Sequence, residues 1–88
     1  MARKPKWSRR LTAPVVPTDG EPMRTLRDLA AYMETLGDRF PRRAWQRAAE
    51  LAIEAAENGG PVEPARRQTM LALILDGRLD VIATPPAK

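Results

Sequence analysis

The apolar residues of this chain fall at helical spacing in three segments that are separated by glycine- and proline-containing turns. Intervals of three and four residues place apolar side chains on one face of a helix, so the spacing predicts helices over residues 26–36, 41–57 and 64–76. The apolar positions are Leu26, Leu29, Ala30, Met33 and Leu36, then Trp45, Ala48, Ala49, Leu51, Ala52, Ile53, Ala55 and Ala56, then Met70, Leu71, Leu73, Ile74 and Leu75. The pattern predicts a mainly α fold, a small three-helix bundle in which the third helix is the most buried.

The ends of the expected helices carry local signals. Thr25 stands at an N-cap position, and Asp28 three residues later completes a pattern resembling a capping box. Pro41 and Pro64 suit the first position of a helix, where the missing N–H has no partner in any case. Residues 58–61, Asn-Gly-Gly-Pro, end the second helix. The turn between the first two helices has the length that a helix-turn-helix needs, and an ordinary antiparallel helix pair is the alternative.

Both ends of the chain differ in composition from its middle. Four prolines within the first 23 residues interrupt any helix there, so we expect a basic, proline-rich arm over 1–23, a three-helix domain over 24–82 and a disordered tail over 83–88. Leu11 to Val16 and Leu79 to Ile82 are candidates for two short strands that pair with each other.

The composition excludes several classes of chemistry. The chain has no Cys and no His, which removes disulfides, zinc sites built on these residues and nucleophilic pairs that depend on them. Glu50, Glu54 and Glu57 share a helix face, but no His, no second carboxylate motif and no phosphate loop supports them as a metal or acid–base site. We therefore expect a non-enzymatic protein without a cofactor or metal. No apolar run approaches the ~20 residues of a membrane span, which predicts a cytoplasmic protein.

Arginines stand where a helix favours acids. The positive end of the helix dipole lies at the N-terminus, so an unpaired cation there is unfavourable by about 0.3–1 kcal/mol. An external anion, such as nucleic-acid phosphate, would explain the arrangement. The candidate nucleic-acid-binding residues lie in the arm and near the starts of the second and third helices: Arg3, Lys4, Lys6, Arg9, Arg10, Arg39, Arg42, Arg43, Gln46, Arg47, Arg66 and Arg67.

Each of these clusters also has a simpler interpretation. The helix arginines suit an ordinary solvated surface, and the arm suits a solubilising terminus with Trp7 folded back onto the domain. Five of the fifteen cations and none of the eleven acids lie in the first ten residues, so the remainder carries a formal charge of −1. The high pI therefore comes largely from the arm. Whether the basic clusters share one face depends on the tertiary structure.

These observations lead to two hypotheses of different classes. The first is a small DNA-binding accessory protein or transcriptional regulator that uses the arm and the helix starts. The second is a protein-binding inhibitor or antiactivator that docks onto an acidic or nucleic-acid-binding surface of a partner. A domain this small buries little surface, which also suggests a homodimer.

The chain resembles a group of short uncharacterised proteins of alphaproteobacterial plasmids and integrative elements. The resemblance rests on residues 6–11, residues 23–29, Trp45, the Gly59-Gly60 pair and the Asp76-Gly77 pair. It implies a mobile genetic element, a setting in which small regulators of transfer and small inhibitors are both common. It carries over no site residue.

Overall fold

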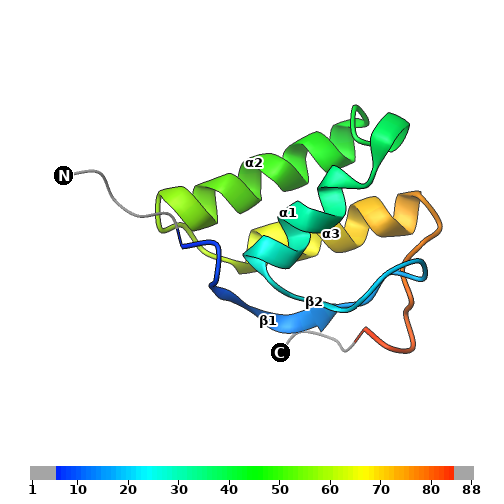
Figure 1. Cartoon of the computed structure of the whole chain (residues 1–88), viewed down its shortest axis with the longest axis horizontal. Helices are drawn as coiled ribbons and strands as arrows, with labels where there is room; N and C mark the ends of the chain where they lie inside the picture. Colours follow the sequence, from blue (N-terminus) through cyan, green and yellow to red (C-terminus); the bar gives the residue numbers. More distant parts are fainter. Residues whose placement is uncertain (1–5, 85–88) are drawn as a thin grey trace.

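In the computed structural model, which describes residues 6–84, three helices pack with a two-stranded antiparallel sheet (Figure 1). The elements are β1 (Arg10–Val15), β2 (Met23–Thr25), α1 (Leu26–Glu34), the 3-10 turn η1 (Gly37–Arg39), α2 (Arg43–Glu57) and α3 (Glu63–Leu75). Helices α1 and α3 lie between α2 on one side and the sheet on the other. The mainly α fold expected from the periodicity is confirmed, and the described residues contain no helix long and apolar enough to cross a membrane.

The local signals at the helix starts are partly confirmed. At α1, Asp28 N–H donates to Thr25 Oγ1 and Thr25 N–H donates to an Asp28 carboxylate oxygen, each at 3.1 Å, which completes the expected capping box. Pro64 lies in the first turn of α3 as expected. Pro41 does not open α2, because Arg42 is extended and its carbonyl accepts the first backbone N–H bonds of that helix. Helix α2 therefore begins two residues later than predicted.

Helix α3 is buried on one side only. Ala65, Thr69 and Leu73 face the core, but Leu71 and Leu75 on the opposite side are 45% and 66% exposed. A continuous apolar run cannot be buried all round a helix that is covered on only part of its circumference. Five of the 13 residues of α3 are buried, against five of 15 in α2 and three of nine in α1, so α3 has the largest buried share, but its apolar run is not buried as a whole.

The strand pairing differs from the prediction. β1 pairs with β2, with Arg10 opposite Thr25 and Val15 opposite Met23, and an irregularity lies between these two pairs. The segment at residues 79–82 contributes only an isolated bridge between Leu79 and Pro17. The buried side chains of β1 and β2 join one core, and this burial favours their pairing over the expected one.

The expected arm belongs to the folded domain over its described residues. Lys6 N–H donates to the carbonyl of Ala56 at 2.7 Å, and Arg27 N–H donates to the carbonyl of Trp7 at 2.8 Å. The Trp7 ring is half-buried against the core. A boundary at residue 23 is therefore wrong. Thr84, expected in the tail, is buried and accepts a bond from Val16 N–H, whereas residues 1–5 and 85–88 lie outside the described part.

Candidate functional site

Two of the candidate arginines bind a carboxylate inside the domain. Asp76 follows α3, and its side chain is only 3% exposed. It accepts hydrogen bonds from Trp45 Nε1 at 2.8 Å, Arg39 Nε at 3.0 Å and Arg42 Nη1 at 2.6 Å. Burial acts to raise the pKa of Asp76, but the bonds from Trp45, Arg39 and Arg42 outweigh it and hold that pKa below its ordinary value. The predicted anion at the start of α2 therefore comes from α3.

The same network continues to the loop after β1. Arg39 Nη2 donates to the Tyr32 hydroxyl at 3.1 Å, and that hydroxyl donates to Asp19 at 2.9 Å. Arg78 Nη1 also donates to Asp19 at 2.9 Å. Burial acts to raise the pKa of Asp19, but these donors hold it below its ordinary value. The network ties α1, η1, α2 and the end of α3 to one loop, which makes it a structural linkage.

The arginines near the start of α3 are also engaged. Arg66 is buried, and its guanidinium donates to the carbonyl of Ala13 in β1 and to Glu63, each at 3.1 Å. Arg67 pairs with the same Glu63 at 3.1 Å. Bonds from Thr12, Arg67 and Arg66 lower the pKa of Glu63. Arg66 thus joins α3 to β1, and the prediction of a phosphate contact for it is wrong.

Arg9, another arm candidate, closes the C-terminus of α2. Its Nη1 donates to the carbonyls of Ala55 at 2.9 Å and Gly60 at 2.6 Å. Cations are favourable at this end because the last helical carbonyls have no partners within the helix. This arm residue therefore has a structural role.

The remaining candidates do not form one basic surface. At the start of α2, Arg47 pairs with Glu50 at 3.1 Å and Gln46 donates to the carbonyl of Phe40 at 3.0 Å, while Arg43 makes no ion pair within the described residues. Lys6 lies at the other end of α2, where its N–H reaches Ala56. The candidates Arg3 and Lys4 lie outside the described residues.

The structure also gathers cations that sequence reasoning missed. Arg24 in β2 and Arg27 in α1 are exposed, and they lie near Arg10 because Arg10 is opposite Thr25. We define Lys6, Arg10, Arg24 and Arg27 as the basic rim; none of the four side chains makes an ion pair in the part of the chain that the structure describes. The pairing of β1 with β2 and the bond from Arg27 N–H to the carbonyl of Trp7 bring residues 6–10 beside Arg24 and Arg27, and the sequence spacing does not indicate this contact.

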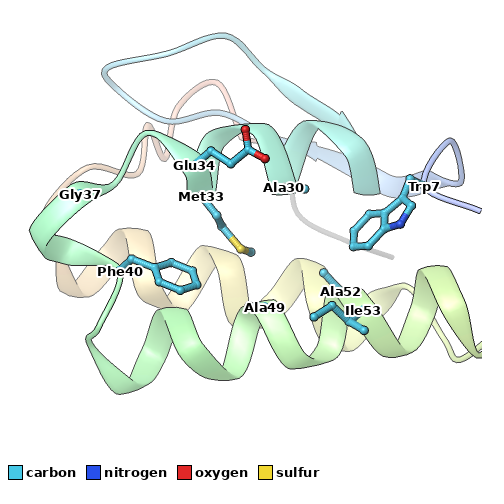
Figure 2. A pocket seen from close by; sticks show the side chains of 9 residues that line it. All are labelled: Trp7, Ala30, Met33, Glu34, Gly37, Phe40, Ala49, Ala52 and Ile53. Atoms are coloured by element: carbon cyan, nitrogen blue, oxygen red, sulfur yellow. The ribbon is translucent and has the colours of Figure 1, made fainter. Parts of the chain in front are cut away.

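An open apolar groove lies between α1 and α2 (Figure 2). Its volume is ≈ 480 Å³, and its lining consists of Trp7, Ala30, Met33, Glu34, Gly37, Phe40, Ala49, Ala52 and Ile53. Trp7 stands at one end and Phe40 at the other, while Met33 points from α1 towards α2. Glu34 is the one charged lining residue, and its carboxylate points away from the space between the helices.

Small side chains leave this groove open. Ala30 from α1 and Ala49 from α2 do not fill the space that the aromatic rings bound at each end. Ile53, at its α2 edge, is 46% exposed. Glu50 and Glu57 stand three residues before and four residues after Ile53, so they lie on the same exposed side of α2. The groove therefore offers an apolar floor with acids along its α2 edge.

Comparisons with protein families, curated proteins and solved structures show no match for this chain. The described residues contain no group of three or more His, Cys, Asp or Glu side chains placed to hold a metal ion.

Proposed function

We propose that this protein is a small protein-binding module, a regulator or inhibitor that receives the apolar face of a partner helix in its α1–α2 groove. The observation that carries the proposal is the open groove of ≈ 480 Å³ with Ile53 at its edge. Helix-in-groove recognition uses an apolar cleft and anchors spaced three and four residues apart on the ligand. Aromatic residues such as Trp7 and Phe40 are typical anchors at such surfaces.

The charge distribution supports this choice over the DNA-binding hypothesis. Arg39 and Arg42 are bound to Asp76, Arg66 is buried, and Arg9 caps α2, so four of the candidate phosphate ligands are engaged within the domain. Moving a buried or internally paired cation onto DNA would leave its present partner without a bond. Binding of a partner in the apolar groove breaks no such internal bond.

Site-specific photo-crosslinking in the native host tests the proposal. With p-benzoylphenylalanine at position 53 in the groove, we expect crosslinks to one or a few defined proteins. The matched control carries the same group at position 43, which is exposed on α2 but does not line the groove. Crosslinks that are equal at both positions, or absent at 53, would contradict the groove assignment.

A DNA-binding accessory protein or transcriptional regulator is the second candidate, and the basic rim favours it. Four exposed cations without ion-pair partners near the start of α1 suit phosphate contacts. In a helix-turn-helix-like variant of this candidate, Arg43 and Arg47 on the first turns of α2 would contact the duplex as well.

Fluorescence-anisotropy titration of mixed-sequence duplex DNA at two salt concentrations tests this second candidate. We expect Arg10→Glu with Arg24→Glu to abolish salt-dependent binding if the rim carries it, and Arg43→Glu with Arg47→Glu to abolish it if α2 does. Each pair reverses two exposed charges, so each controls for the other. No binding by the unaltered protein would remove this candidate.

A further inference from the structure

A second apolar surface lies on the outer side of α3. Leu71, Ile74 and Leu75 are 45%, 54% and 66% exposed, and their spacing of three and four residues sets them side by side on the helix. We call these three residues the α3 ridge. The ridge has the anchor spacing that a groove-bound helix uses.

The charges beside the ridge complement those beside the groove. Arg67 stands four residues before Leu71 on α3, and its side chain is 74% exposed. Arg78 lies beyond the end of α3, and its half-exposed side chain binds Asp19. Along the groove, Glu50 and Glu57 flank Ile53 on the exposed side of α2. The ridge therefore has a cation, Arg67, beside its apolar residues, and the groove edge has acids on both sides of Ile53.

The ion pairs that these charged residues make within one molecule do not prevent the ridge from contacting the groove edge of another. Arg67 is paired with Glu63, Arg78 with Asp19, and Glu50 with Arg47, at 2.9 to 3.1 Å. Arg67 is 74% exposed and Glu50 is 68% exposed, and exposed pairs contribute only about 0–1 kcal/mol. The Arg67–Glu63 and Arg47–Glu50 pairs therefore exchange for intermolecular pairs at little cost, while the Arg78–Asp19 pair stays in the structural network.

We propose that the α1–α2 groove of one molecule receives the α3 ridge of a second copy of this chain. The inference rests on the proposed function, since it names an occupant for the same groove. The ridge faces away from the core on α3, whereas the groove opens on the α1 side of α2. The contact is therefore head-to-tail, and copies add in a row or close into a ring instead of forming a two-fold dimer.

Sedimentation velocity of the full chain tests this inference. Between about 10 µM and about 500 µM, a range suited to weak association, we expect the weight-average mass to rise at least about twofold without a plateau at two copies. A monomer across this range would overturn the inference, and so would a plateau at the dimer.

Two surface variants make the test specific. Ile74→Glu removes the ridge and Ile53→Glu removes the groove edge; both positions are exposed, and circular dichroism verifies that the fold is kept. We expect each variant alone to stay monomeric and an equimolar mixture to form a heterodimer and nothing larger, because one intact ridge then meets one intact groove. A mixture that stays monomeric would overturn the inference.

Val81→Glu is the matched control, since Val81 is also an exposed apolar residue but lies outside the ridge and the groove. We expect it to associate as the unaltered protein does, and loss of association would overturn the assignment to α3. Crosslinks from position 53 separate the two proposals. Crosslinks to other proteins from a chain that stays monomeric would overturn self-docking and retain the proposed function, whereas the absence of both would overturn both.

Discussion

Arginines lie at both ends of α2, but the helix dipole acts on them in opposite ways. At its start, Arg39 and Arg42 sit near the positive end of the helix dipole and are held by Asp76 from the end of α3. At its end, Arg9 arrives from outside the helix and donates to the carbonyls of Ala55 and Gly60, where a cation is favourable. At the start of α2, a buried acid offsets the unfavourable interaction of the cations with the dipole. At the end of α2, the cation stabilises the helix directly.

This difference changes what an arginine cluster indicates. Cations at a helix start suggest an external anion only when no internal acid reaches them. Here Asp76 is distant in the sequence from Arg39, and the tertiary fold brings the two together at 3.0 Å. The surfaces available to a partner are then the apolar groove, the α3 ridge and the basic rim.

The largest expected effect is at the start of α2. Asp76→Ala leaves the buried Trp45 indole N–H and the Arg39 guanidinium without their acceptor, so we expect a loss of about 3 kcal/mol in the free energy of unfolding. Urea denaturation measures it. Asp38→Ala is the control, because Asp38 is exposed and makes no ion pair within the described residues. Equal stabilities of the two variants would contradict the structural role of Asp76.

A smaller loss is expected at the other end of α2. Arg9→Met keeps most of the apolar stem but removes the bonds to the helix carbonyl of Ala55 and to the carbonyl of Gly60 just beyond the helix, which predicts a loss of about 1–2 kcal/mol by urea denaturation. Arg10→Met, at the exposed neighbouring position, should change stability by less than about 0.5 kcal/mol. If Arg10→Met costs as much, the capping role of Arg9 is wrong.

Acid should weaken the fold in part through Asp76 and Asp19. The folded-state pKa values of Asp76 and Asp19 lie below the ordinary value of 3.8, so their contribution is fully present above that value and is lost as pH falls below it. We expect the free energy of unfolding, measured from pH 6 to pH 2, to fall below about pH 4. Asp76→Asn should flatten this fall, and an unchanged slope would show that other carboxylates cause it.

The smallest effect is a gain. Arg43 opens α2 without an ion-pair partner within residues 6–84, and the first turn of this helix has no acid. Arg43→Glu should raise the free energy of unfolding by about 0.3–1 kcal/mol, because an acid suits the positive end of the dipole. Thermal denaturation at low and moderate salt measures the gain, which added salt should reduce. Arg43→Gln, which only removes the charge, should give a smaller gain, and a loss in both variants would mean that Arg43 has a partner.

The helices could be predicted from the sequence because their determinants are local. Apolar spacing located all three helices, the Thr25–Asp28 pair marked the start of α1, and Pro64 marked the start of α3. Each signal acts within one or two helical turns and therefore needs no knowledge of the rest of the chain.

The candidate site could be predicted only in part. Trp7 and Ile53 are recognisable as apolar residues, but the groove exists because α1 and α2 lie side by side with small residues between them. Of the twelve candidate nucleic-acid-binding residues, sequence reasoning had no means of seeing that Arg9 reaches α2 or that Arg66 reaches β1.

The amino-acid sequence by itself determined the number and approximate extent of the helices and the capping of α1, because backbone hydrogen bonds and caps join residues a few positions apart. Tertiary structure alone decided that β1 pairs with β2, that Asp76 neutralises the start of α2, and that α3 keeps an exposed apolar face. These features depend on contacts between residues distant in the chain, and side-chain burial in one shared core selects among them.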